Sequence, residues 1–401
     1  MPGALRRPGP RPAAPAPDAS PQRSGDPSTA VPGPHHPVSG RDAALPQPRF
    51  PARSAFRATV KRQVAQYFAD TGQAPTGDWR LFVQTGVILA WLAGSYAILV
   101  FVPTSLLVTM LAVFALAQGL ALAGFNIMHS GAHESYAPSK TINWLMGGML
   151  NVLGGSQRLW RHKHNRLHHI YTNIHPFDND LHTSGLLRFS PAQPWRPWHR
   201  LQHLDALAVY SLLTLSWVTV GDWRKLVSGH IGPYKLPPPT VGDVGVLVVT
   251  KLGYFGYALI LPCFLHPWQH VLLAFVAVHL IFGVTLSLAF QLAHTVERTS
   301  FPAPDAHTGM MPRGWAEHEV ATTADFAPHN PVATWYLGGL NFQIEHHLFP
   351  RICHIHYPAI SAMVAATCHE FALPYVCYPT VRAALAGHYG FLKALGRRPN
   401  A

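Results

Sequence analysis

The sequence predicts an all-α integral membrane protein, in which four transmembrane helices carry a cytosolic helical cap rich in histidine. Only 12% of the residues are charged, whereas a soluble domain has about 25%. Several apolar runs are long enough to cross a bilayer as helices. Three histidine clusters lie outside these runs, and their spacing places side chains on one face of a helix.

The apolar runs predicted to cross the membrane are residues 81–102, 105–125, 244–265 and 270–290. Each would be roughly 32 Å long as a helix, which matches the hydrocarbon core. Two shorter runs, Trp144–Leu153 and Ala206–Val220, fall below that length. They are predicted to lie at the interface or to pack on the protein.

The charge pattern predicts the orientation of these spans. The loops within the two helix pairs contain neither Lys nor Arg, so the positive-inside rule places them outside. Both termini and all three histidine clusters are then cytoplasmic, which they must be if the clusters share one site. A fifth span at Ala206–Val220 would put the third cluster on the opposite side of the membrane.

The sequence divides into a tail, a membrane domain and a short end. Residues 1–55 are predicted to be disordered, because they are rich in Pro, Ala and Arg and poor in large apolar residues. Residues 56–390 form the membrane domain, and residues 391–401 form a C-terminal tail. The formal net charge of +12 is dispersed around the membrane segments, which favours membrane lipid or a phosphate-bearing substrate and not nucleic acid.

The three histidine clusters are His129-Ser-Gly-Ala-His133, His164-Asn-Arg-Leu-His168-His169 and Gln343-Ile-Glu-His346-His347. On a helix, His129 pairs with His133 and His164 pairs with His168, while the adjacent His169 and His347 can reach a neighbouring ion. The clusters can therefore hold two metal ions. Because no Cys except Cys353 lies beside them, the site suits iron, copper or zinc bound by imidazole, and two irons would activate dioxygen.

These boxes resemble the membrane fatty acid desaturase family, especially its linoleoyl-CoA and front-end branch, from about Phe56 to Tyr389. The likeness includes Trp160-Arg-His-Lys-His164, His169-Ile-Tyr-Thr-Asn173, Phe290-Gln-Leu-Ala-His294, Thr322-Thr-Ala-Asp-Phe326 and Gly338-Gly-Leu-Asn-Phe-Gln-Ile-Glu-His-His-Leu-Phe-Pro350. The resemblance implies an enzyme that inserts a carbon–carbon double bond into a fatty acyl chain. It further implies a non-haem diiron centre that uses dioxygen and two electrons.

The resemblance also implies the residues of the site. By box position the metal ligands are His129, His133, His164, His168, His169, His346 and His347. His294 matches a further ligand position, and His318 is a weaker candidate. Asn173 and Gln343 are candidates for tuning the centre by hydrogen bonds. The expected cofactors are two Fe2+ ions, and the expected substrate is a fatty acyl lipid or an acyl-CoA.

The sequence departs from the family pattern at three places. Ser130 stands where the branch often has Asp, so a supporting carboxylate must come from elsewhere, and Asp178 and Asp180 are candidates. Gln343 replaces a histidine of other branches, and its amide is a poorer iron ligand. The tail lacks the His-Pro-Gly-Gly of a fused cytochrome b5 domain. The electron donor is therefore expected to be a separate ferredoxin-, rubredoxin- or cytochrome b5-like protein with its reductase.

Two polar residues fall within the predicted spans. Lys251 is expected to snorkel toward the interface, and His279 to make an interhelical hydrogen bond or to lie near an acyl tunnel.

Two other functions stay open at this point. A lipid hydroxylase or another oxygenase could use the same scaffold, and a non-catalytic metal-binding membrane protein could carry the same histidines. A zinc hydrolase is disfavoured, because the sequence has no H-E-x-x-H and more imidazoles than one zinc uses.

Overall fold

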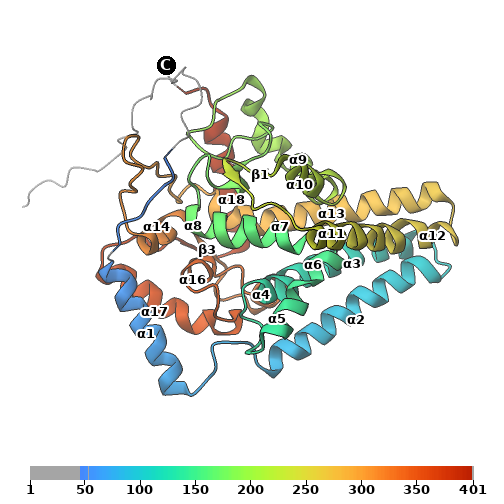
Figure 1. Cartoon of the computed structure of the whole chain (residues 1–401), viewed down its shortest axis with the longest axis horizontal. Helices are drawn as coiled ribbons and strands as arrows, with labels where there is room; N and C mark the ends of the chain where they lie inside the picture. The colour runs from blue at the N-terminus through green and yellow to red at the C-terminus, as the bar shows by residue number, and fades with distance from the viewer. Residues whose placement is uncertain (1–45, 53, 400–401) are drawn as a thin grey trace, which may run out of the picture. The chain divides into compact units, whose positions relative to one another are not determined.

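The computed structural model describes residues 46–52 and 54–399, which fold almost entirely into helices (Figure 1). Two of the long helices are continuous, α2 (Trp79–Phe101) and α13 (Trp268–His294). The other three long segments are each built of consecutive helices: Leu106–Ala132 consists of α3 (Leu106–Leu122), η1 (Ala123–Met128) and α4 (His129–Ala132), and Val241–Cys263 consists of α11 (Val241–Phe255), η6 (Gly256–Ile260) and α12 (Leu261–Cys263). The segment Pro197–Ser228 consists of η4 (Pro197–Leu201), α9 (Gln202–Ser216), η5 (Trp217–Gly221) and α10 (Asp222–Ser228). The segments η1, η5 and η6 are π-helical.

The apolar runs predicted as spans are confirmed as helices, and local sequence explains where they begin. The Asp78 side chain accepts a hydrogen bond from the Arg80 N–H at the start of α2. The Ser105 and Thr240 side chains do the same for α3 and α11. Such caps satisfy backbone donors that have no partner inside a helix. The second and fourth spans continue beyond the apolar runs, to Ala132 and His294, so His129 and His294 lie on these extensions.

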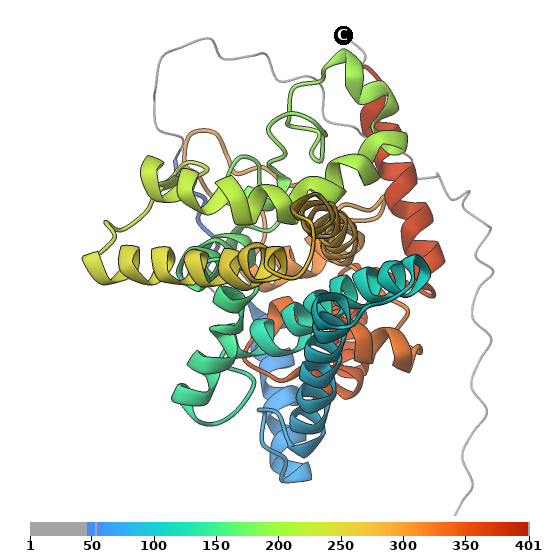
Figure 2. The same ribbon diagram turned by 90° about the vertical axis from the view of Figure 1, so that its right-hand side faces the viewer.

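The helix at residues 197–228 differs from the prediction. Ala206–Val220 was expected to be too short to cross a membrane, but it belongs to a continuous helical segment of 32 residues. The described residues thus contain five helices long and apolar enough to span, one more than predicted. The apolar run did not include the flanking turns, because His199, Gln202 and Lys225 interrupt the apolar pattern without breaking the helix. In Figure 2 this segment lies beside α13, and Thr214 donates a hydrogen bond to the His279 carbonyl.

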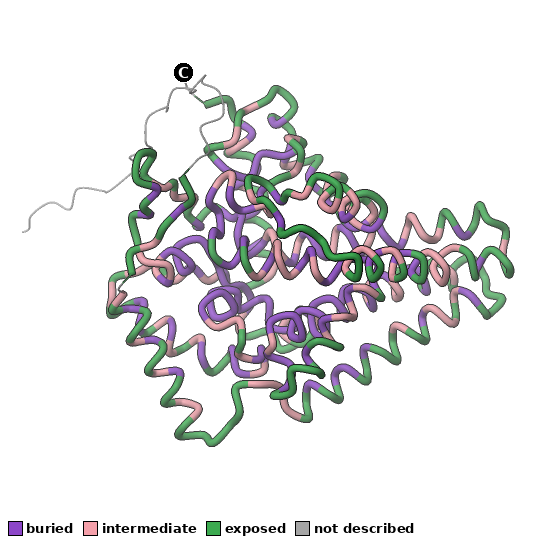
Figure 3. The backbone as a smooth tube through the Cα atoms, in the orientation of Figure 1, coloured by how far each residue is buried: buried purple, intermediate pink, exposed green. Residues whose placement is uncertain are grey.

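Shorter elements surround one end of the long helices (Figures 1 and 2). The helices are α1 (Ala55–Thr71), α5 (Lys140–Gly147), α6 (Met149–Val152), α7 (Gln157–Arg161), η2 (His162–His168), α8 (His169–Tyr171), η3 (Asn179–Leu181), α14 (Trp315–Thr322), α15 (Pro331–Leu337), α16 (Gln343–Leu348), η7 (His354–His356), α17 (Tyr357–Glu370) and α18 (Val381–Gly396). Strands β1 (His230–Ile231) and β2 (Tyr234–Lys235) pair antiparallel, and β3 (Asp325–Phe326) and β4 (Cys377–Tyr378) pair parallel. Figure 3 shows the most continuous burial where these short helices meet the ends of α3 and α13.

Residues on both sides of the predicted membrane domain, 56–390, pack on it. Of the tail predicted at residues 1–55, residues 1–45 lie outside the described residues. The next residues pack on the domain, since Gln47 donates a hydrogen bond to the Tyr171 hydroxyl at 2.8 Å and the Phe50 ring contacts His318 edge-on. At the other end, α18 runs past residue 390 and buries Phe391 and Leu392.

The polar residues within the long helices are buried and paired. Lys251 does not snorkel, as the sequence suggested, but is 3% exposed and forms an ion pair with Asp222 at 3.0 Å. His279 makes the expected interhelical hydrogen bonds, to the Tyr254 hydroxyl at 2.5 Å and to the Thr214 hydroxyl at 3.1 Å. A buried charge is tolerated only when it is paired and hydrogen-bonded, and Asp222 supplies that pairing.

Candidate metal centre

Four separate segments bring the predicted histidines together. His129 begins α4 at the end of the second long helix, and His133 follows that helix directly. His294 is the last residue of α13. The second box lies on the π-helix η2 and on α8, and the third box lies on α16. The eight strong candidates are all buried in one region.

The first group consists of His129, His133, His164 and His346, whose nitrogens all lie within 4.8 Å of one another. The Nε2 atoms of His129 and His164 are 3.2 Å apart. The His133 ring lies 4.6 Å from the His129 ring and 4.9 Å from the His346 ring. Four imidazoles that converge at such distances can hold one metal ion.

The second group consists of His168, His294 and His347, which meet the same distance limit. Their rings lie 4.7 to 5.0 Å apart. His169 lies between the two groups, with its ring 4.6 Å from His346 and 4.3 Å from His347.

The second box contributes to both groups. His164 and His168 were expected to bind one ion together, and they do meet in a third candidate group with Asp180, but His164 also lies in the first group and His168 in the second. Both residues lie on the π-helix His162–His168. The two rings are still only 5.3 Å apart. His169 and His347 were both predicted to reach a neighbouring ion. His347 lies in the second group while His346 lies in the first, whereas His169 belongs to neither group.

Several of these nitrogens fit a metal because they have no other partner. Within the part of the chain that the structure describes, the buried Nε2 atoms of His133, His346 and His347 and both ring nitrogens of His294 make no hydrogen bond. Such orphaned polar atoms are rare in protein interiors. Burial lowers the pKa of His164, His169, His346 and His347 well below the usual range. These imidazoles are therefore neutral at neutral pH, which is the form that binds a metal.

Carboxylates contact the Nδ1 atoms of two of these histidines, His168 and His347. The Asp178 oxygens lie 3.2 Å from His168 Nδ1, and an Asp180 oxygen lies at 3.3 Å. Burial alone would lower the pKa of His168, but these two carboxylates outweigh burial and raise it. A Glu319 oxygen lies 2.7 Å from His347 Nδ1. In both cases the Nδ1–H donates to the carboxylate, so that Nε2 presents its lone pair to the site.

Asp178 and Asp180 were predicted to fill this role, whereas Glu319 was missed. Glu319 is fully buried on α14, and burial raises the pKa of its carboxyl. The Thr172 hydroxyl lies 2.9 Å from the same Glu319 oxygen that contacts His347. The only sequence signal for Glu319 was a carboxylate within a short helix that otherwise packs inward.

A second acidic contact missed by sequence reasoning lies behind α16. The Tyr375 hydroxyl is 2.6 Å from Asp325 and 3.1 Å from Glu345, and burial raises the pKa of both carboxyls. Asp325 also accepts a hydrogen bond from the Ile344 N–H at 2.9 Å. These contacts fix the helix that carries His346 and His347.

The remaining site candidates are Asn173 and Gln343, which were predicted to tune the centre, and His318, the weaker ligand candidate. Asn173 donates hydrogen bonds to the carbonyls of His294 and Thr322, at 2.8 and 3.1 Å, so it ties box two to the end of α13. His318 donates to the Thr172 carbonyl at 2.8 Å and belongs to neither histidine group. Gln343 is 2% exposed at the start of α16, and its amide makes no hydrogen bond to the described residues.

A comparison of the sequence with protein families identifies the family of this chain. The family model described as fatty acid desaturase matches residues 103–379, which is more than half of the chain and includes every histidine of both groups. The chain belongs to the fatty acid desaturase family. The resemblance inferred from the histidine boxes is thereby confirmed, and the desaturase is an oxidoreductase.

Curated desaturases resemble the chain over most of its length. An sn-1 linoleoyl-lipid 6-desaturase of Synechocystis is 35% identical over 87% of this chain and 98% of its own length. An enzyme of the same name from Arthrospira platensis is 36% identical over 86% of this chain and 93% of its own length. An acyl-lipid (8-3)-desaturase of Physcomitrium patens is 36% identical, over 85% of this chain and 72% of its own length.

Proposed function

We propose that this desaturase inserts a double bond into an acyl chain of a membrane lipid, using two iron ions held by the two histidine groups. The observation that carries the proposal is the division of the buried histidines into two adjacent groups, with His169 between them. One catalytic zinc would use only three protein ligands. Two groups of neutral imidazoles without any thiolate instead suit a pair of iron ions.

The proposed ligands are the histidines of the first group for one iron and those of the second group for the other, with His169 available to either. Two irons bound there would supply, with dioxygen, two electrons and two protons, the oxidation that converts two methylenes into an alkene and releases two waters. The protein contributes orientation. Asp178, Asp180 and Glu319 fix which nitrogen of His168 and His347 faces the site, and the burial of all eight rings excludes bulk water.

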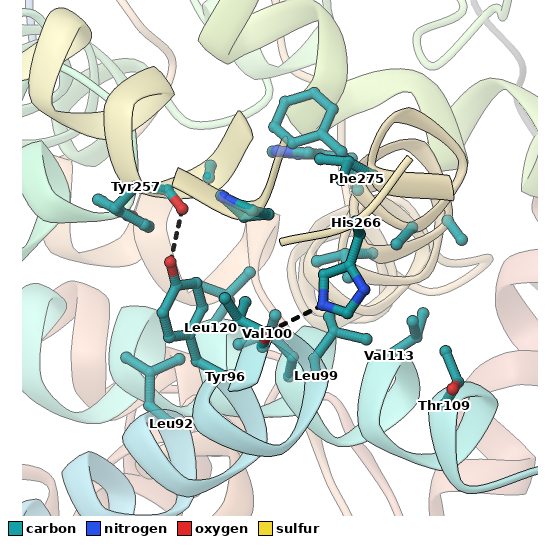
Figure 4. Close-up of a pocket in the computed structure, with 18 of the residues that line it drawn as sticks. Leu92, Tyr96, Leu99, Val100, Thr109, Val113, Leu120, Tyr257, His266 and Phe275 are labelled. Atoms are coloured by element: carbon teal, nitrogen blue, oxygen red, sulfur yellow. Dashed lines mark hydrogen bonds between the residues drawn. The ribbon is translucent and has the colours of Figure 1, made fainter. Parts of the chain in front are cut away.

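An apolar cavity between the long helices fits the rest of an acyl chain. It has a volume of about 1600 Å³ and is lined by α2, α3, α6, α11, η6 and α13 (Figure 4). Figure 4 shows Leu92, Leu99, Val113 and Leu120 around it, with the Tyr96 hydroxyl bonded to the Tyr257 carbonyl. Leu120 lies on the same helical segment as His129, and at 1.5 Å per residue the two are roughly 13 Å apart. The methyl end of a chain could therefore occupy the cavity while carbons nearer the head group lie at the irons.

The substrate carrier follows from the relatives' names. All three of the relatives described above are named as acyl-lipid or linoleoyl-lipid desaturases, so a membrane lipid is favoured over acyl-CoA. We propose that a ferredoxin-, rubredoxin- or cytochrome b5-like protein supplies the electrons.

We further propose that only four of the five candidate helices cross the bilayer. His168 and His294 meet in one group, so an even number of crossings must separate them along the chain. Segments 241–263 and 268–294 supply two crossings. Segment 197–228 then remains on the side of the site, against α13. With the basic loops inside, the site and both termini face the cytoplasm.

The test is to express the desaturase with a compatible reductase and donor and to profile the cellular lipids by mass spectrometry. An additional double bond at one position, lost in a variant with His346→Ala, is the expected result. An alcohol carrying labelled oxygen from dioxygen would instead indicate a hydroxylase. Ala274→Phe, which narrows the cavity, should shift the preferred acyl chain toward shorter lengths. An unchanged length preference would refute the role of the cavity.

A further inference from the structure

A buried ion pair lies between two of the long helical segments. Lys251 of α11 is 3% exposed, and Asp222 of α10 is fully buried. The Lys251 ammonium lies 3.0 Å from an Asp222 oxygen and also donates to the Val218 carbonyl at 2.9 Å. The other Asp222 oxygen accepts a hydrogen bond from the Trp217 indole at 2.9 Å. Both charged side chains are therefore held in one orientation.

The same two side chains hold one loop of the backbone. Lys251 donates to the Gly154 carbonyl at 2.6 Å, and Asp222 accepts from the Ser156 N–H at 3.0 Å. The Tyr254 ring closes the loop from the side, because a methyl group added to Gly154 would lie only 2.9 Å from it. Gly154 also has a positive φ of 87°, which favours glycine. The ion pair thus clamps residues 154–156.

This loop joins the acyl cavity to the metal centre. Leu153, just before it, lines the cavity. Ser156, at its end, caps α7, which continues into η2 with His164 and His168. His164 is a member of the first group and His168 of the second, so this helix contributes to both. A shift of the loop would move the cavity wall relative to both metal positions.

We propose that Lys251 and Asp222 are positioning residues that set which carbons of the acyl chain lie at the metal centre, and hence the position of the double bond. This inference rests on the proposed function of the cavity and the histidine groups. Stability alone does not explain the pair, because buried ion pairs can often be replaced by apolar residues at little or no loss of stability. What an apolar replacement cannot reproduce is the set of directed bonds to Gly154 and Ser156.

The experiment compares two variants that disturb the clamp in different ways. Lys251→Met with Asp222→Asn removes both charges together and leaves no unpaired ion. Asp222→Glu keeps both charges but lengthens the arm that holds Ser156. The matched control is Arg158→Met, which removes a partly exposed ion pair of 3.3 Å between α7 and Asp243 of α11 and leaves both ions of the clamp in place.

We expect both clamp variants to retain their metal and to place double bonds at an additional carbon. A displacement of about 1 Å can reduce a rate roughly 100-fold, so turnover per metal-loaded enzyme should fall by about 10- to 100-fold. Arg158→Met should keep the wild-type isomer and rate. A purely structural role would lower the yield of folded enzyme without moving the double bond.

Either clamp variant is informative if the other does not fold. The proposal is overturned if folded, metal-loaded enzyme of either variant keeps the wild-type isomer ratio and turnover. Failure of the underlying proposal looks different, because Ala274→Phe would then leave the chain-length preference unchanged in otherwise wild-type enzyme.

Discussion

The hydrogen bond between Glu319 and His347 offers a direct test of the metal centre through the change Glu319→Gln. The carboxylate lies 2.7 Å from Nδ1 and is fully buried, so it fixes the tautomer in which Nδ1 carries the proton. Glutamine has the same shape but can present an NH2 group to Nδ1. That donor would move the proton to Nε2, the nitrogen that has no partner among residues 46–52 and 54–399.

The expected loss of metal affinity follows from the role of such carboxylates. Loss of a carboxylate that orients a ligating histidine typically costs 10- to 100-fold in metal affinity, which is about 1.4 to 2.8 kcal/mol. Only the second group should be affected, because Glu319 contacts no histidine of the first group. We therefore expect one of the two metal ions to be bound more weakly and the other to be unchanged.

Anaerobic titration with Fe2+ in competition with a chelator measures both affinities, and lipid profiling measures turnover. Glu317→Gln is the control, because it makes the same change in charge on the same helix, where Glu317 accepts a hydrogen bond from the Ser54 hydroxyl. It should leave metal affinity unchanged. Wild-type affinity at both sites in Glu319→Gln would refute the assignment of His347 as a ligand held by Glu319.

Three further predictions concern the same centre and its surroundings. His346→Ala should lower bound iron and abolish desaturation together, as metal analysis and product analysis on one preparation would record; full activity without metal would contradict the proposal. Deletion of residues 1–45 should leave the purified enzyme active. A longer deletion, through Phe50, should in addition lower the free energy of unfolding by about 1 kcal/mol, because the contact of Phe50 with His318 is lost. Gln343→Ala should keep most iron and lose most turnover, and Gln343→His should not raise it; near-normal desaturation by Gln343→Ala would remove this residue from the site.

The sequence was sufficient for features that depend on local periodicity. Apolar runs located the helical segments that carry His129 and His294 near their ends, since membrane length and hydropathy are properties of one segment. Spacing also paired His129 with His133 correctly, because that turn follows helical geometry. For His164 and His168, spacing predicted two neighbouring rings, which lie 5.3 Å apart, but it could not show that each ring also meets histidines of a different segment. The apolar pattern likewise underestimated segment 197–228, whose ends carry polar residues within an unbroken helix.

The carboxylates that orient the site could not be placed by such patterns, because their partners are remote in the sequence. Glu319 contacts His347 and Thr172, and Asp222 contacts Lys251 and Ser156. Helical spacing relates residues only to their neighbours three or four positions away. A different signal was available, since only 12% of this chain is charged and a buried charge without a partner is costly. In such a chain, an acidic residue within an apolar helix must meet a cation, a metal-bound ring or a backbone donor. Both Glu319 and Asp222 satisfy that requirement at segments that carry or position the histidines.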